Sequence, residues 1–332
     1  MRNIKFLLGV ALVFLLALPA TEARGQIYRV EEMNTQQICA LDREKTAVLL
    51  PGGILEEHGP YLPSFSDSYM NQRLTQEVAN AIVARPGWKV LLFPLNPLGT
   101  GGANEIGGKY VFSGTYTVRF STLRAIFMDL ATELGEQGFR WIFVISTHMA
   151  PNHNRALDQA GDYFGDMYGG HMVNLNGLQP VSGAWEEGAK LMREEERQED
   201  GFAVHAGMIE TSINLFLRPD LVSPAYKSAR AQTGRNMDEL ARLAKGEKWP
   251  GYFGSPRLAS AAFGALVWKH QSSQFVEFAL KILDGLDERQ VTRYGDIMKA
   301  SSANVAIDKA ALEHDQEMER KQVDWLGNKG LR

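Results

Sequence analysis

Short apolar runs alternate with amphipathic segments through the first half of the chain. The runs have the length of buried strands and lie at residues 46–51, 88–93, 141–145 and 171–175. The segments between them have apolar residues at helical spacing, over 68–84, 118–137 and 154–167. Strands that alternate with helices predict an α/β fold: a three-layer α/β/α sandwich with a mostly parallel central sheet. In such sheets the active site lies beyond the carboxyl ends of the strands.

The N-terminus has the pattern of a secretory signal peptide. Arg2 and Lys5 precede an apolar run over 6–18, and small residues lead to a cleavage point after Ala23. An uncleaved anchor is the alternative, but the run is shorter than the ~20 residues that a spanning helix needs. We therefore expect residues 1–23 to be removed, export to the periplasm, and no stable membrane insertion afterwards.

The rest of the chain is expected to form one domain with a helical tail. Residues 24–287 contain the alternating elements, and no internal repeat or low-complexity linker divides them. A charged stretch at 186–201 is typical of a solvated helix end or loop. Residues 288–332 are polar and helix-prone, and are expected to form a C-terminal extension. This extension is either an arm that packs on a neighbouring subunit or a surface appendage.

Composition excludes some classes of partner and site. The 332 residues are 45% hydrophobic, with a formal net charge of -4 and no long basic stretch, so nucleic acid is not an expected partner. Cys39 is the only cysteine, which excludes an intramolecular disulfide and a thiolate metal cluster. We interpret Cys39 as a small buried hydrophobe rather than a nucleophile.

The first candidate site follows the strand at 46–51. Glu56 and His58 are two residues apart, so their side chains face the same way in an extended segment, and Asp67 follows nine residues later. Carboxylate and imidazole ligands together suit zinc, manganese or iron. A loop that merely contains polar residues, with His58 hydrogen-bonded, fits the spacing equally well.

Two further candidates lie later in the chain. His148 comes just past the strand at 141–145, where an α/β site is expected, although it could instead cap the next helix. His153, its neighbour, is expected at the surface. His205 and Glu210 precede an apolar helical stretch at 213–217. There Glu210 could simply complement the helix dipole, with a neighbouring Thr or Ser as the cap.

Several of these segments together resemble the creatininase family of cyclic-amide and amide hydrolases. The family pattern is roughly G-S-x-E-Q-H-G-P-H-L-P-x-x-T-D, and residues 53–67 read G-I-L-E-E-H-G-P-Y-L-P-S-F-S-D in register. Four later segments resemble family motifs in the same order, at 112–115, 205–212, 218–222 and 254–264. The resemblance spans about residues 44–285 and is far more specific than any single motif.

The resemblance implies a centre of two divalent metal ions. Glu56 and His148 would hold one ion, His58 would hold the other, and Asp67 would bridge them. Zn²⁺ is the expected metal, with Mn²⁺ or Fe²⁺ as alternatives. A metal-bound hydroxide would hydrolyse the C–N bond of a small, possibly cyclic, amide.

The family also assigns catalytic roles and an assembly. His205 would be a proton donor or transition-state stabiliser, a role that suits histidine because the ordinary pKa of an imidazole lies near working pH. Glu210 joins it as a catalytic candidate and is also the best remaining candidate for the last metal ligand. The substrate would be a small-molecule amide. The resemblance also implies that the chain forms a homo-oligomer, a hexamer as in other members of the family.

The chain departs from the family at three places. Ala150 stands where creatininase proper has a ligating glutamate, Tyr61 replaces a histidine, and the acid before the H-A-G motif is missing at 202–204. These changes argue against creatinine as the substrate. They leave open a catalytically impaired paralogue that binds or scaffolds, and also a peptidase acting on a short exported peptide.

Overall fold

A parallel five-stranded sheet forms the centre of the computed structural model, which describes residues 26–331. The strands, in spatial order, are β1 (Ile27–Arg29), β3 (Lys89–Leu92), β2 (Thr46–Pro51), β4 (Trp141–Ile145) and β5 (His171–Asn174). Every neighbouring pair is parallel. Four of these strands were predicted, while β1 has only three residues and lacks a long apolar run.

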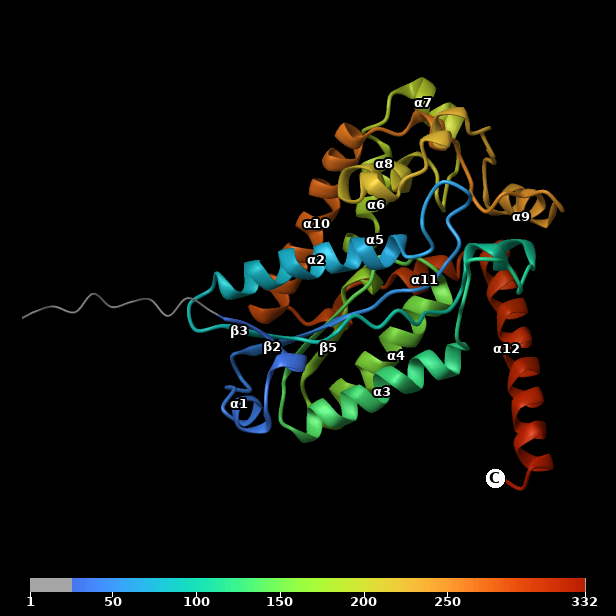
Figure 1. Cartoon of the computed structure of the whole chain (residues 1–332). Coiled ribbons are helices and arrows are strands. Elements are labelled where there is room, and N and C mark those ends of the chain that lie inside the picture. Colours follow the sequence, from blue (N-terminus) through green and yellow to red (C-terminus); the bar gives the residue numbers. More distant parts are fainter. Residues whose placement is uncertain (1–25, 332) are drawn as a thin grey trace, which may run out of the picture.

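One face of the sheet is covered by α2 (Ser66–Val83) and α10 (Ala261–Leu283) (Figure 1). Successive side chains of a strand point to opposite faces, so Ala47 and Leu49 of β2 face this layer. They belong to a buried cluster that includes Leu74 of α2 and Phe275 of α10.

The other face is covered by α3 (Phe120–Glu136) and α4 (Pro151–Tyr168) (Figure 1). Val48 and Leu50, the alternate residues of β2, pack there with Phe127 of α3. The three-layer sandwich is therefore confirmed.

The strand order places the site. β3 lies on one side of β2 and β4 on the other, so the direction in which the sheet is built reverses at the β2–β4 pair. Pro51 and Ile145, the last residues of these strands, are register partners, and the Gly52 N–H donates to the Ile145 carbonyl. Ligands of open α/β sheets bind in the crevice outside such a switch point. The segments that start at Gly52 and Ser146, 94 residues apart in the chain, therefore leave the sheet side by side.

Short helices and loops fill the space beyond the carboxyl ends of the strands (Figure 1). The helices there and at the sheet edges are η1 (Val30–Glu32), α1 (Thr35–Cys39), η2 (Ala103–Gly107), η3 (Leu175–Gly177), α5 (Gln179–Ser182), α6 (Ala184–Ala189), α7 (Glu194–Asp200), α8 (Met208–Leu217), η4 (Pro219–Leu221), η5 (Pro224–Ser228), α9 (Met237–Lys245) and η6 (Pro256–Leu258). The charged stretch at 186–201 covers the end of α6, the turn that follows it, and α7.

The C-terminal segment is mostly helical. It comprises η7 (Glu288–Gln290), α11 (Tyr294–Met298) and α12 (Ser302–Asn328). The first part of α12 packs against α4, α9 and η2, and the helix then runs along the edge of the molecule to the C-terminus (Figure 1). The proposed boundaries at residues 23 and 287 stay predictions, and the signal peptide lies outside the described residues. Among residues 26–331, no helix combines the length and apolarity that crossing a membrane requires.

Two local predictions are wrong. Cys39 is exposed rather than buried, because it ends the short surface helix α1. α4 begins at Pro151, three residues earlier than expected, since proline is well suited to the first turn of a helix.

Candidate metal centre

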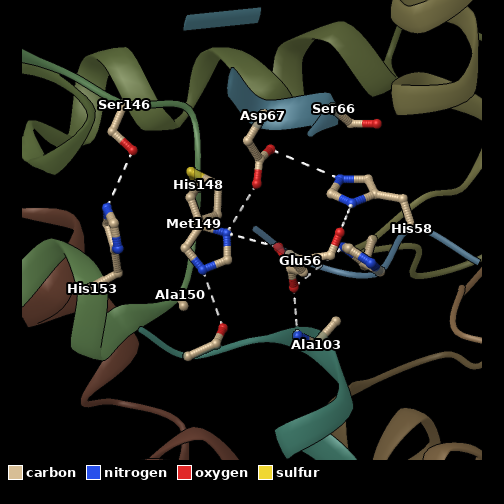
Figure 2. Close-up of polar contacts among 12 residues, drawn as sticks. Glu56, His58, Ser66, Asp67, Ala103, Ser146, His148, Met149, Ala150 and His153 are labelled. Atoms are coloured by element: carbon tan, nitrogen blue, oxygen red, sulfur yellow. Dashed lines mark hydrogen bonds and ion pairs between the residues drawn. The ribbon is translucent and has the colours of Figure 1, made fainter. Parts of the chain in front are cut away.

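Four of the predicted ligands converge beyond the β2–β4 switch point (Figure 2). Glu56 and His58 lie on the segment that leaves β2, Asp67 lies in the first turn of α2, and His148 lies on the segment that leaves β4. All four are buried. The Glu56 N–H donates to the Ser64 carbonyl, which folds the segment back so that α2 begins beside it.

His148 faces two carboxylates. Its Nδ1 atom lies 3.1 Å from Oε2 of Glu56 and 3.5 Å from Oδ2 of Asp67. Its Nε2 atom lies 3.2 Å from the Thr100 carbonyl and 3.1 Å from the Gly101 carbonyl, so Nε2–H is the donor and Nδ1 is directed at the acids. Burial lowers the pKa of His148, but the negative charges of Glu56 and Asp67 beside it raise it well above its usual value.

His58 is oriented in a similar way. Its Nδ1 atom lies 3.1 Å from the Glu56 carbonyl, which leaves Nε2 free to act as a ligand. That Nε2 atom lies 3.9 Å from Oδ1 of Asp67 and 3.9 Å from Oε2 of Glu210. Both imidazoles are therefore held through one nitrogen by backbone carbonyls, the arrangement typical of metal-binding histidines.

The ligand atoms form two groups of three that share one residue. Glu56, Asp67 and His148 make one group, and His58, Asp67 and Glu210 make the other. Within each group the ligand atoms lie within 4.8 Å of one another. Because the carboxylate of Asp67 belongs to both groups, it could bridge two metal ions. A third group, which overlaps with these, adds His205 to Glu56 and His58.

Buried polar atoms at this centre lack partners. Oε2 of Glu56, Nε2 of His58 and Oδ2 of Asp67 have no hydrogen-bond partner among the described residues. Burying such an atom unsatisfied costs about 1–3 kcal/mol, and more if it is charged. All three face the same centre, so the residues present fit a pair of divalent cations. Two dications would satisfy these atoms and neutralise the acids.

Glu56 is held in place by a backbone donor. The Ala103 N–H, at the start of η2, lies 2.5 Å from its Oε1 atom (Figure 2). Burial raises the pKa of Glu56, but the charges of His205 and His148 lower it below its usual value. The carboxylate therefore stays ionised and available as a ligand.

His205 lies beside this centre on a strained segment. Its Nε2 atom lies 2.6 Å from the Glu57 carbonyl, its Nδ1 atom lies 3.7 Å from Oε1 of Glu56, and its ring centroid is 4.4 Å from that of His58. Burial lowers the pKa of His205, but the charge of Glu56 and the contacts with Glu57 raise it to about 10. Ala206, which follows, has φ +50, in the left-handed region that a non-glycine residue rarely adopts. That conformation directs the Ala206 N–H to Oε2 of Glu210.

The sequence analysis missed one buried acidic residue of this region, Glu57. Glu57 is 3% exposed, its Oε1 atom lies 3.8 Å from Nε2 of His205, and its Oε2 atom accepts the Gly59 N–H. It stands where the family pattern has a glutamine, and this difference was the available signal.

The prediction for His153 is wrong. His153 is 1% exposed, and its Nδ1 atom accepts the Thr100 N–H. Its Nε2–H points at the Ser146 hydroxyl (Figure 2). Burial and the nearby charge of His148 hold the pKa of His153 well below its usual value. Because α4 begins at Pro151, its first turn directs this side chain under the sheet edge, where it supports the backbone that orients His148.

Comparison with known proteins agrees with this geometry. The family described as "Creatininase: Creatinine amidohydrolase" matches residues 31–279. The chain belongs to the creatininase family. It is thus a creatininase-family hydrolase, of the peptidase and amidohydrolase kind.

Relatives of this creatininase-family chain differ in what their names describe. The mycofactocin precursor peptide peptidase of Mycobacterium ulcerans (strain Agy99) is 24% identical over 253 residues, which cover 71% of this chain and 86% of that protein. A crystal structure of creatinine amidohydrolase matches with a TM-score of 0.57 at 20% identity, covering 78% of this chain and 98% of that one. A putative creatinine amidohydrolase from Bacteroides fragilis NCTC 9343 matches with a TM-score of 0.54 at 20% identity, covering 78% and 97%. At these identities the solved structures establish the fold alone.

Proposed function

We propose that this creatininase-family chain is a metal-dependent amidohydrolase with two divalent ions. Glu56, Asp67 and His148 would hold one ion, and His58, Asp67 and Glu210 the other. The observation that carries the proposal is the sharing of Asp67 by two groups of buried ligand atoms, three of them without partners. The ions, when bound, would supply an acidified water and polarise the substrate carbonyl.

The protein's own contribution is to hold ligands and a proton. His205 is fixed by the bond from its Nε2–H to the Glu57 carbonyl, so its Nδ1 atom faces the ligand side. A proton held at Nδ1 can pass to the amide nitrogen as the C–N bond breaks, which makes His205 the general acid. Glu210 is 23% exposed, so it lies between the buried centre and the solvent side from which a substrate enters.

Zn²⁺ is the expected metal, with Mn²⁺ and Fe²⁺ as alternatives. The donor set of carboxylates and imidazoles, without thiolates, suits all three ions. Among the structural matches, one is described as "Creatininase Mn", with a TM-score of 0.56, and a mutant creatininase is described as "Zn-Zn type". Both support this choice of metals.

Position 150, where creatininase proper would have a ligating glutamate, bears on whether the second metal ion can bind and so on whether the enzyme is active. Ala150 cannot bind a metal, which motivates the alternative of an impaired paralogue that binds or scaffolds. Glu210 offers a carboxylate oxygen 3.9 Å from Nε2 of His58, so the second group still has three ligands. The geometry therefore favours an active enzyme.

The substrate is a small amide, and a short peptide is the second candidate. A mutant creatininase among the structural matches is described as complexed with creatine, which supports a small C–N substrate. The mycofactocin precursor peptide peptidase supports a peptide instead. We also propose that the chain is exported, which the mass of the mature protein would test by showing whether the signal peptide has been removed. We propose further that it assembles as a homo-oligomer, which sedimentation would test.

The deciding experiment combines metal analysis with a substrate screen. Purified protein is loaded separately with Zn²⁺, Mn²⁺ or Fe²⁺, and bound metal is counted after dialysis. Each form is then given lactams, formamides, cyclic ureides and short peptides. Two equivalents of metal with hydrolysis of one class support the proposal and name the class. Failure to retain any metal after reconstitution would refute it, and two equivalents without turnover would favour the impaired paralogue.

A further inference from the structure

The C-terminal helix α12 lies outside the segment matched to the family, yet it contacts the wall of the candidate site. Family similarity ends at residue 279, and α12 begins at Ser302. We propose that α12 is a positioning element: through Asp315 it fixes the loop over residues 108–119, which in turn holds the metal-ligand segment. This inference rests on the proposed function.

The central contact is a helix cap supplied from far along the chain. Oδ2 of Asp315 accepts the N–H of Phe120 at 2.7 Å, across 195 residues of sequence. Phe120 is the first residue of α3, and Arg119 precedes it at the N-cap position. An arginine side chain has only donors and cannot accept that bond. Asp315 therefore provides both the acceptor and the negative charge that a helix N-terminus favours.

Two more contacts between α12 and the loop over residues 108–119 hold the two ends of that loop. The ring of His314 stacks on Tyr110, with centroids 4.2 Å apart and planes inclined by 7°. Oε1 of Glu319 lies 2.9 Å from Nη1 of Arg119. Tyr110 is near the start of the loop, and Arg119 is at its end. One face of α12 thus holds both ends of the same loop.

The loop in turn contacts the ligand segment. Oγ1 of Thr115 accepts the Glu57 N–H at 3.0 Å and donates to Oδ1 of Asn104 at 2.9 Å. The Tyr116 N–H donates to the Leu55 carbonyl at 2.8 Å. Leu55 and Glu57 are the immediate neighbours of Glu56. The loop therefore sets the path of the backbone that carries two proposed ligands, Glu56 and His58.

The chain of contacts predicts a specific effect. Loss of the Asp315 cap should release the end of the loop while the metal ligands themselves remain. Because displacements of about 1 Å can cost up to 100-fold in rate, we expect a loss of about tenfold in kcat with two equivalents of metal still bound. The amide of Phe120 should also exchange its hydrogen faster, with or without metal.

The test compares Asp315→Ala with Asp315→Asn in the full-length protein. The asparagine retains an oxygen that can accept the Phe120 N–H, so it should restore wild-type behaviour. Burial raises the pKa of Glu105 to about 7, with a further contribution from the charge of Asp315. Both variants remove that charge, so a difference between them reports the hydrogen bond alone. Trp325→Ala, in the exposed distal part of α12, is the matched control and should change nothing.

Three measurements are read together: kcat, the absorption spectrum of the Co²⁺-substituted protein, and hydrogen exchange at Phe120. Changed values in Asp315→Ala and restored values in Asp315→Asn support the inference. Wild-type spectrum and exchange in Asp315→Ala would overturn it, as would an asparagine variant that behaves like the alanine. If wild-type protein turns over no substrate, the proposed function fails, while exchange and spectrum still decide the inference. Should Asp315→Ala not fold, His314→Ala with His314→Phe as its conservative partner gives the same comparison.

Discussion

Nε2 of His58 lies 3.9 Å from Oε2 of Glu210, although 152 residues separate the two in the chain. His58 comes from the segment that leaves β2, and Glu210 from the first turn of α8. Creatininase proper is expected to complete this ligand group with a glutamate at the position of Ala150. Here the side chain at 150 is a methyl group packed against Gly101, where an added Cβ would come within 2.6 Å of it. The second ligand group therefore depends on α8.

Replacing Glu210 should remove one metal ion and leave the other. In Glu210→Ala only His58 and Asp67 remain from the second group, while Glu56, Asp67 and His148 are untouched. We expect one equivalent after dialysis, measured by atomic emission, where the wild type keeps two. Glu195→Ala removes an exposed acid of α7 and serves as the control. Two equivalents in Glu210→Ala would show that another residue completes the site.

Replacing Asp67 should release both ions. Its two oxygens face different histidines, Oδ1 toward His58 at 3.9 Å and Oδ2 toward His148 at 3.5 Å. Asp67→Ala therefore leaves each group with two ligands. Metal content should fall below about half an equivalent under conditions where Glu210→Ala keeps one, because a ligand shared by both ions is lost. Full metal content in this variant would contradict the bridging role.

A glycine at the contact between α8 and α10 should be intolerant of substitution. A Cβ at Gly264 would lie 1.9 Å from the Ser212 carbonyl oxygen, so Gly264→Ala must push the two helices apart. We expect a loss of about 2 kcal/mol or more in unfolding free energy. Gly295→Ala in α11 meets no atom within 4 Å and should instead stabilise by about 0.5–1 kcal/mol. Denaturant titration measures both, and equal effects would exclude a clash at Gly264.

The pair of His171 and Glu288 should make stability depend on pH. Protonated His171 donates from Nδ1 to Oε2 of Glu288 at 2.7 Å, and this hydrogen bond raises the pKa of His171, while partial burial lowers it less. Because the pKa of His171 is higher in the folded state, the pair adds to the free energy of unfolding. This contribution is complete below the unfolded pKa of about 6.5 and is lost as pH rises through the folded pKa. Glu288→Gln should therefore destabilise more at pH 6 than at pH 9.

The control for this pH dependence is Glu277→Gln. Glu277 pairs with Lys281, which keeps its charge over the same range. The control should shift unfolding free energy equally at the two pH values. If Glu288→Gln lowers the free energy of unfolding by the same amount at pH 6 and pH 9, the titration of His171 is not the source of the effect.

Periodicity predicted four of the five strands and the covering helices α2, α3 and α4, because each is buried on a regular face, whereas the covering helix α10 was not predicted. The runs that became β2 and β4 are five or six residues long and almost wholly buried. β1 was missed because three residues at a sheet edge carry no periodic signal. The strand order was also not predicted, since pairing depends on contacts between distant segments.

The site was predicted through motifs, and its supporting contacts were not. Glu56, His58, Asp67 and His148 share a centre because the carboxyl ends of β2 and β4 are neighbours. The burial of His153 follows from where α4 begins, which local sequence placed three residues too late. Contacts across long sequence separations, such as that of Asp315 with Phe120, leave no pattern that periodicity can detect.

The ligands of the proposed centre come from four separate segments: the ends of β2 and β4 and the first turns of α2 and α8. An unfolded chain cannot bring these together, so any ion bound there favours the native state by mass action. With a single cysteine, the chain cannot form a disulfide within itself. The two ions would then serve as its cross-links, and chelation would weaken the fold as well as stop hydrolysis.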